Sequence, residues 1–316
     1  MRRIRDRSEL FLFRSIKFFA SFLPRSLLLS WGRSLGLVLY HVNRKHRQIS
    51  LSNLKTAFGE ELSPRVLKSI SRRCFMYYGQ VILDIIKFPY LSEKKKSSIM
   101  VMEGQDHLEK ALRKGKGALL FSGHYGNWEI ASYYLSKLAK LNVIARPLDN
   151  TFLEKELSRL RTSLGAKVIS KHQATKHILY SLREKEMVAI LIDQNVLRSQ
   201  AVFVDFFGKK AATTPSLAAF FLRTQAPLIP VFCYPATSHK YLLHISRPLE
   251  ISLSGDHSQD MLKITQICTK IIEIQIQKNP HYWFWLHKRW KTRPEGEEQE
   301  KASETNIMRN PSRKER

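Results

Sequence analysis

The residues best suited to chemistry lie in the stretch SGHYGNWEIAS, residues 122–132, where His124 precedes Glu129 by five positions. A carboxylate beside an imidazole accepts one ring N–H, fixes the tautomer and stabilises the imidazolium, so that the other ring nitrogen can take a proton from a hydroxyl. We therefore expect Glu129 to pair with His124 and the substrate's own alcohol to be the nucleophile. The alternative is a loop histidine followed by a carboxylate that only interacts with a helix dipole.

Short apolar runs that suit strands alternate with longer amphipathic runs that suit helices over most of the chain. The predicted strands are residues 118–122, 142–147, 167–170, 187–193, 227–234 and 241–248, and the predicted helices are residues 127–140, 151–164, 172–184, 215–225 and 258–278. This alternation predicts an α/β fold whose sheet is flanked by helices. The sheet should be mixed, because only a short loop separates the last two strands. His124 then lies just beyond the carboxyl end of a strand, where α/β sheets bind ligands.

Two further charged residues lie near this edge or beside an apolar stripe. Asp193 follows the run VAILI and therefore ends a predicted strand. If this strand is parallel to the strand before His124, Asp193 and His124 lie at the same edge of the sheet. A turn aspartate is the alternative. Arg161 borders a helical stripe of leucines, which by itself indicates a snorkelling or ion-paired helix residue.

Two basic amphipathic helices, broken near Pro24, are predicted at the N-terminus. The first fifty residues hold eleven Lys or Arg against two acids, interleaved with LFLF, FFASFL and LLLSWG. A clean transmembrane span is not favoured, because the apolar runs are interrupted by Arg14, Lys17, Arg25 and Arg33. Such helices lie in the headgroup region of a membrane with Phe and Leu buried. A helix packed on the domain and a short tilted span are the alternatives.

The charge and the cysteines limit the classes of partner and cofactor. The chain of 316 residues carries a formal charge of +26, so its partners are expected to be nucleic acid, a phospholipid surface or acidic substrates. A non-catalytic nucleic-acid-binding module would explain the charge, but no helix-turn-helix, RNP or zinc pattern is evident. Cys74, Cys233 and Cys268 are far apart without CxxC spacing, which supports neither a disulfide framework nor a zinc site.

The composition divides the chain into four segments. We expect membrane-associating helices over residues 1–45 and a helical segment over residues 46–100, in which Gly59 and Pro64 separate two helices and a lysine-rich connector follows. The α/β domain should cover residues 101–294. Residues 295–316 contain almost no apolar side chains and should be disordered.

Several blocks of the sequence together resemble one enzyme family. SGHYGNWEIAS resembles the H-x4-[DE] block of the glycerolipid acyltransferase superfamily, and its Asn-Trp-Glu form is similar to the bacterial lipid A biosynthesis acyltransferases of the lauroyl/myristoyl type. Further blocks match in order over roughly residues 30–296: NLKTAFGE, RPLDNTFLEKELSRLRTSLGAKVIS, LIDQN, VFVDFFGKKAATTPSLAAFFLRTQAPLIPVF and HYWFWLHKRWKTRPEGE. The resemblance implies that His124 is the catalytic base and Glu129 its acidic partner. It adds Arg161, and Asp193 as orienter of Arg161 or of the acceptor.

The resemblance also implies a substrate class and a location. The family moves a fatty acyl chain from acyl carrier protein, with acyl-CoA as the alternative donor, to a free hydroxyl of a lipid A precursor. It implies a site on the phospholipid surface of the bacterial inner membrane, at its cytoplasmic face, with no cofactor, no metal and no nucleic acid. No EGTR-like block follows, which argues against a lysophosphatidate-type acceptor. A glycolipid such as a phosphatidylinositol mannoside stays open as acceptor.

Other residues of the same motifs are expected to bind substrate. These are Arg146, Asn127 and Gln194. Arg146 and the basic cluster Lys288, Arg289, Lys291 and Arg293 are candidates for contacts with phosphates of the acceptor or with the acidic face of a carrier protein, and a solvated basic face is the alternative. The run WFWLH, residues 283–287, would supply aromatic surface near those charges or simply core.

Overall fold

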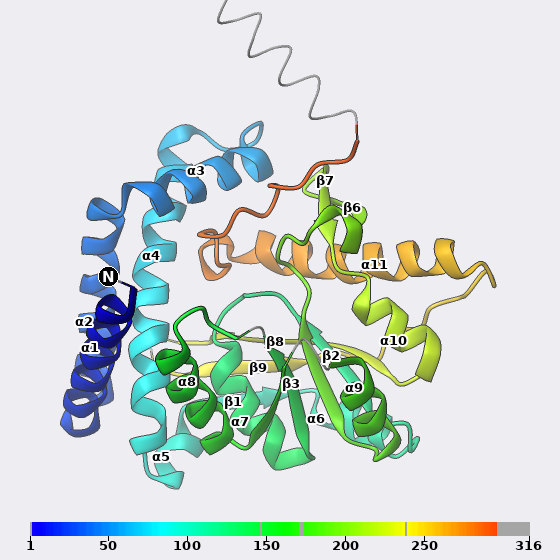
Figure 1. Cartoon of the computed structure of the whole chain (residues 1–316), viewed down its shortest axis with the longest axis horizontal. Helices are drawn as coiled ribbons and strands as arrows, with labels where there is room; N and C mark the ends of the chain where they lie inside the picture. The colour runs from blue at the N-terminus through cyan, green and yellow to red at the C-terminus, as the bar shows by residue number, and fades with distance from the viewer. Residues whose placement is uncertain (1, 146, 171–173, 238, 296–316) are drawn as a thin grey trace, which may run out of the picture.

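A seven-stranded sheet lies at the centre of the computed structural model, which describes residues 2–145, 147–170, 174–237 and 239–295 (Figure 1). The strand order is β1-β9-β8-β2-β5-β3-β4. The strands are β1 (Met100–Glu103), β2 (Ala118–Ser122), β3 (Leu141–Ala145), β4 (Ala166–Ser170), β5 (Met187–Leu191), β8 (Leu228–Pro235) and β9 (Tyr241–Ile245). Pairing is antiparallel between β8 and β9 and parallel at every other junction of this sheet. The predicted mixed α/β sheet is therefore confirmed.

Helices account for most of the remaining described residues. The α-helices are α1 (Arg2–Phe22), α2 (Arg25–Val42), α3 (Arg44–Phe58), α4 (Pro64–Lys87), α5 (Glu93–Ser98), α6 (Gln105–Leu112), α7 (Trp128–Leu138), α8 (Thr151–Ser163), α9 (Ala174–Arg183), α10 (Ser216–Thr224) and α11 (His257–Lys278). Short 3-10 helices are η1 (Phe88–Tyr90), η3 (Arg198–Gln200) and η4 (Pro280–Tyr282). A separate antiparallel hairpin consists of β6 (Val202–Phe206) and β7 (Lys209–Thr213).

The sheet separates two apolar cores because its central strand is buried on both faces. All five side chains of β2 are buried. Leu119 and Phe121 belong to a cluster with residues of α4, α9, α10 and α11. Ala118 and Leu120, which point to the opposite face of the strand, belong to a cluster with residues of α6 and α7. The result is three layers, helix on sheet on helix, and the H-x4-E motif begins just after the middle strand of the sheet.

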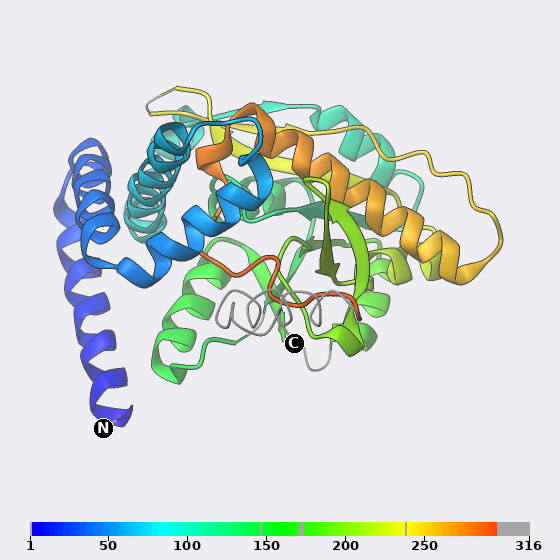
Figure 2. The same ribbon diagram turned by 90° about the horizontal axis from the view of Figure 1, so that it is seen from above.

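The N-terminal helices form a second body of structure on one side of the sheet, outside α4 (Figures 1 and 2). Pro24 separates α1 from α2, as the sequence predicts. Helix α2 lies against α4 at a backbone contact, since a Cβ added at Gly36 would lie 2.2 Å from the carbonyl oxygen of Phe75 and one added at Gly32 would lie 2.5 Å from that of Gly79. Beside this contact the guanidinium of Arg25 donates to the buried carboxylate of Asp84 over 2.7 Å.

The outer faces of α1 and α2 expose large apolar side chains. Phe11, Phe18 and Phe22 on α1 are 75%, 61% and 74% exposed, and Trp31 and Val38 on α2 are 52% and 55% exposed. Within the described ranges, no helix combines the length and the apolar composition that a membrane crossing requires.

Several smaller elements differ from the expectations. The predicted lysine-rich connector contains α5, which begins after Ser92 because the Ser92 hydroxyl accepts a hydrogen bond from the amide of Lys95. Strand β1, helix α6 and the hairpin of β6 and β7 were not predicted. The prediction of a disordered tail concerns residues 296–316, which lie outside the described residues, together with the described residue Glu295.

The glycine contact between α2 and α4 should be essential to their packing. In Gly36→Val the new side chain meets the α4 backbone, which cannot move away as a flexible side chain can, so the free energy of unfolding should fall by roughly 1–3 kcal/mol or more. Urea denaturation followed by circular dichroism measures the change. Ser34→Val, at an exposed position of the same helix, is the matched control and should change stability little. Equal stability of the two variants would contradict the close packing.

Candidate active site

The loop between β2 and α7 carries His124, and the register of the sheet determines what it faces. Strands β2 and β5 are parallel neighbours in which Ser122 pairs with Leu191. His124 and Asp193 each lie two residues beyond this pair, so both lie at the carboxyl edge of the sheet. The imidazole Nδ1 of His124 donates to Oδ1 of Asp193 over 2.7 Å, and the backbone amide of His124 donates to Oδ2 over 2.7 Å.

Asp193 is buried and surrounded by donors. The indole Nε1 of Trp283 also donates to Oδ2, over 2.6 Å. Gly123 permits this approach, since a Cβ there would lie 3.0 Å from the same carboxylate oxygen. Burial by itself raises the pKa of Asp193, but the charge and hydrogen bonds of His124 outweigh it and hold the pKa well below its usual range. The ionised carboxylate therefore fixes the proton of His124 on Nδ1, so that Nε2 carries the lone pair, which faces the side-chain amide of Gln194.

The expected pairing of Glu129 with His124 is wrong in this geometry. Both oxygens of Glu129 instead accept from Nε of Arg161, over 3.1 and 3.0 Å, and Nη2 of Arg161 also donates to Oε1. The sequence likewise suggested that Asp193 orients Arg161. In the structure Asp193 pairs with His124 and Glu129 pairs with Arg161, so each carboxylate has the partner expected for the other. The reason is topological: the carboxylate from the neighbouring strand reaches Nδ1, whereas Glu129 lies in the first turn of α7 and points to α8.

The Glu129–Arg161 ion pair connects α7 with α8 and is mostly shielded from solvent. The side chains are 10% and 15% exposed. Burial opposes the charge of Arg161, but the hydrogen bonds and attraction of Glu129 outweigh it and raise the arginine pKa. The arginine is therefore held in its charged form.

An apolar cavity extends from this ion pair beneath the carboxyl ends of the central strands. Its empty space is about 660 Å³, open mouth included. Trp128, Glu129 and Arg161 line it, together with residues of β2, β3, β5 and β8 that include Leu120, Val143, Ala189 and Val231. The ring of Trp128 contacts the His124 ring edge to face, with 4.9 Å between the centroids. The cavity thus lies beside the imidazole, with Trp128 between them.

The three expected substrate-binding residues have different surroundings. Gln194 is exposed, and its Nε2 lies 3.2 Å from Nε2 of His124, the ring nitrogen that does not contact Asp193. Asn127 is fully buried: its Oδ1 caps α7 at the amide of Ile130 and its Nδ2 donates to the Tyr241 hydroxyl. This placement suits an amide that holds the loop rather than one that contacts substrate. Arg146 lies outside the described residues.

The C-terminal motif is partly buried, although Lys288 and Lys291 within it are exposed. Trp283 and Trp285 are 0% exposed, so they provide core and not aromatic surface. Arg289 is also fully buried and donates to the Ala212 carbonyl and the Thr213 hydroxyl, which removes it from the candidates for phosphate contact. Burial lowers its pKa to about 10.

Two residues that support the site were not predicted from the sequence. The indole N–H of Trp283 donates a hydrogen bond to the carboxylate of Asp193. The Tyr78 hydroxyl lies 2.8 Å from the carbonyl oxygens of both His124 and Tyr282 and donates to one of them. Phe284 also donates its amide to the His124 carbonyl over 2.9 Å. The sequence could have indicated these two residues, because a Tyr O–H or a Trp N–H within an apolar segment is usually buried and then requires a hydrogen-bond partner.

The ion pair of Glu129 and Arg161 should contribute to stability as a unit. Glu129→Gln leaves the arginine charge without its counter-ion and should lower the free energy of unfolding by about 3 kcal/mol. The double variant Glu129→Gln/Arg161→Met should be much less destabilised than the sum of the single variants, since it removes both charges. Urea denaturation of the four proteins measures the coupling. Arg159→Met, at an exposed position of α8, is the control, and additive effects at positions 129 and 161 would contradict the pairing.

Comparison with known proteins assigns the chain to a family. The family model described as bacterial lipid A biosynthesis acyltransferase matches residues 4–292. The chain is 26% identical over 282 residues to the lipid A biosynthesis acyltransferase of Haemophilus influenzae, covering 88% of this chain and 86% of the relative. It is 23% identical over 277 residues to the lipid A biosynthesis palmitoleoyltransferase of Escherichia coli, covering 87% and 88%.

A further relative is named for a different glycolipid. The phosphatidylinositol mannoside acyltransferase of Mycobacterium tuberculosis is 26% identical over 220 residues, which covers 67% of each chain. The family model, by contrast, covers nearly all of the described residues, including the loop of His124 and both of the carboxylate pairs. The chain therefore belongs to the bacterial lipid A biosynthesis acyltransferase family.

Proposed function

We propose that this protein transfers a fatty acyl chain of the lauroyl or myristoyl class from acyl carrier protein to a hydroxyl of a lipid A precursor, with His124 as general base. The observation that carries the proposal is the His124–Asp193 pair, in which Nδ1 is engaged by an ionised carboxylate while Nε2 faces the exposed side of the loop. Family membership supports the reaction class.

The proposed reaction proceeds by direct transfer. Nε2 of His124 accepts the proton of the acceptor hydroxyl as its oxygen attacks the thioester carbonyl, and Asp193 stabilises the imidazolium that forms. The tetrahedral intermediate then collapses, the C–S bond breaks, and the imidazolium returns the proton to the leaving thiolate. Gln194 now lies beside Nε2, so its exposed amide has to give way to the acceptor hydroxyl.

The apolar cavity is the proposed site of the acyl chain. Its walls are mainly aliphatic, and each buried methylene contributes about 0.8 kcal/mol to binding. The Glu129–Arg161 pair borders the cavity, so we assign these two residues to positioning the substrate and holding α7 against α8. In this assignment neither exchanges a proton with the substrate.

The exposed aromatic face of α1 and α2 is the proposed contact with the cytoplasmic leaflet of the inner membrane. Exposed Phe and Trp side chains gain by entering the acyl region, and the net charge of +26 favours an anionic lipid surface. A basic module that only binds nucleic acid would have no use for this apolar face.

A phosphatidylinositol mannoside is the second candidate acceptor. The relative from Mycobacterium tuberculosis, which is named for that lipid, supports it. Assays with purified enzyme should therefore offer both glycolipids, with lysophosphatidate as the comparison acceptor.

The base and its orienting carboxylate should act as one unit. His124→Ala should lower kcat by roughly 100-fold or more, the usual contribution of a general base, and Asp193→Asn should also lower it strongly because an amide cannot stabilise the imidazolium. The double variant should be scarcely worse than His124→Ala, since residues of one catalytic unit are strongly non-additive. Initial rates of acyl transfer from acyl carrier protein measure the effects.

The matched control for this series is His257→Ala, at an exposed position at the start of α11, which should retain full activity. Circular dichroism verifies that each variant is folded. A fully active His124→Ala enzyme, or penalties that multiply in the double variant, would rule out the mechanism.

The membrane contact should depend on the phenylalanines of α1. Replacing Phe11, Phe18 and Phe22 with Ser should release much of the protein from vesicles of phosphatidylethanolamine and phosphatidylglycerol, because each substitution removes an exposed apolar side chain that would enter the bilayer. Co-sedimentation measures the bound fraction. Tyr180→Ser, at an aromatic on α9 that is 60% exposed, is the control. Unchanged binding of the triple variant would show that the membrane contact lies elsewhere.

A further inference from the structure

A hollow lined by cationic side chains lies between α2, α4 and the turn that joins β8 to β9. Its empty space is about 970 Å³, open mouth included. The charged and titratable cationic groups that line it come from all three elements and from η4: Arg25, Arg33, Arg73, His239, Lys240 and His281. No Asp or Glu is among its described lining residues. The hollow is separate from the apolar cavity, with which it shares no lining residue.

Most of the positive charge around this hollow has no carboxylate partner among the described residues. Arg25 is neutralised by Asp84, but no ion pair with a carboxylate joins Arg33, Arg73 or Lys240 in that part of the chain. A contrasting case is Glu156, which draws Arg14, Lys17 and Arg159 around one buried carboxylate. Cations gathered without an internal anion create a local positive potential that favours an anion from outside.

His281, which lines the hollow, is affected by this positive potential. Nη2 of Arg73 lies 3.1 Å from Nε2 of His281, and because a guanidinium only donates, the ring nitrogen must be the acceptor. Burial and the charges of Arg73 and Arg33 lower the pKa of His281 to about 4. The histidine is therefore neutral and holds the guanidinium of Arg73 in place without cancelling its charge.

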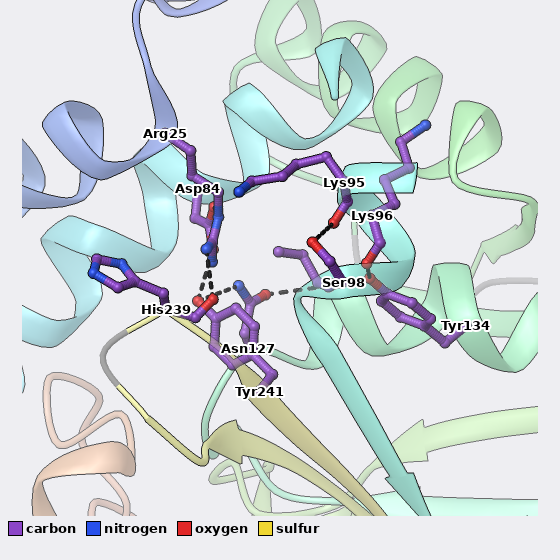
Figure 3. Close-up of polar contacts among 10 residues, drawn as sticks. Arg25, Asp84, Lys95, Lys96, Ser98, Asn127, Tyr134, His239 and Tyr241 are labelled. Atoms are coloured by element: carbon purple, nitrogen blue, oxygen red, sulfur yellow. Dashed lines mark hydrogen bonds and ion pairs between the residues drawn. The ribbon is translucent and has the colours of Figure 1, made fainter. Parts of the chain in front are cut away.

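Two hydrogen-bonded connections place the hollow beside the proposed catalytic loop. Asn127 donates to the Tyr241 hydroxyl over 3.2 Å, and Tyr241 donates to Asp84 over 2.8 Å, where Arg25 binds (Figure 3). On the other side, the amide of Gly126 donates to the Tyr282 carbonyl over 2.8 Å. Tyr241 and Tyr282 both line the hollow.

The sheet gives the two spaces a defined order along one edge. Strand β8 runs parallel to β2, so the turn after β8 lies at the same carboxyl edge as His124. The apolar cavity extends from this loop toward β5 and β3, whereas the cationic hollow lies on the side of β9. A molecule that presents a hydroxyl to His124 has an apolar space on one side and a cationic space on the other.

We infer that this hollow binds a phosphate group of the acceptor lipid, through Arg33, Arg73 and Lys240. The inference rests on the proposed function for the identity of the acceptor. Arginines match the geometry of phosphate oxygens with paired N–H donors, and several donors from different elements surround a multiply charged anion. The cations line a concave space, which suits a lipid headgroup.

The test compares binding of phosphorylated and dephosphorylated acceptor in neutral detergent micelles, with no acyl donor present. The wild-type protein should prefer the phosphorylated lipid by about tenfold or more, the effect of losing charge-assisted hydrogen bonds. Arg33→Gln/Lys240→Gln should lose most of that preference. Both side chains are exposed, so the replacements should leave the fold intact. Lys68→Gln/Arg72→Gln, exposed on α4 and equal in charge change, is the matched control and should keep the preference.

Each other outcome overturns the inference. Equal preference in the wild type and the Arg33→Gln/Lys240→Gln variant would show that the phosphate binds elsewhere. Weaker binding of both acceptor forms would show that the hollow does not recognise phosphate. A variant that loses only affinity for phosphatidylglycerol vesicles would assign the hollow to membrane phospholipid. Because no acyl transfer is measured, failure of the proposed function appears separately, as absence of turnover by the wild-type enzyme.

Discussion

The carboxylate of Asp193 is the interaction on which the geometry of the candidate site depends. It joins the ends of two neighbouring strands, because it accepts from both the backbone and the ring of His124 at the end of β2 while belonging to the chain that follows β5. The indole of Trp283 attaches the C-terminal segment to the same oxygen. A buried carboxylate is costly without such donors, so the three donors and the charge are mutually required. The backbone path of the loop and the tautomer of the imidazole thus follow from one residue.

The sequence named the candidate residues of this site but not their partners. His124, Glu129, Arg161 and Asp193 were predicted through the H-x4-E spacing and the resemblance of the surrounding blocks, and the structure joins them in two pairs. The pairing could not be read from spacing, because it depends on which strands are neighbours. Strands β2 and β5 are adjacent although β3 and β4 lie between them in the chain. Proximity in sequence therefore favoured Glu129, whereas proximity in the sheet selects Asp193.

The same distinction explains which elements of the fold were predictable. Strands β2, β5 and β8 are largely apolar runs, and β3 and β4 each interrupt an apolar run with one polar residue, Asn142 or Lys167. The long helices repeat with a clear period, so both kinds of element were predicted. Strand β1 has four residues, of which only alternate ones are partly buried, and this pattern is too short to be read. The hairpin of β6 and β7 turns at Phe207 and Gly208, both with positive φ, where Asn or Gly is usual at the first position. The turn was therefore not recognised in the sequence, because Phe207 occupies the position where Asn or Gly would indicate a hairpin.

The N-terminal helices are connected to the candidate site through charge as well as packing. Arg25 begins α2, and its guanidinium reaches Asp84 on α4 and the carbonyl of His239 in the turn after β8. Asp84 accepts in turn from Tyr241, which receives the amide of the loop residue Asn127. A helix whose outer face is apolar is thus coupled, through one buried ion pair, to the loop that carries His124. Because burying that pair is favourable only when every donor is satisfied, α2 can hold its position only together with the turn and the loop, and a lipid surface that orients α2 would orient the carboxyl edge of the sheet with it.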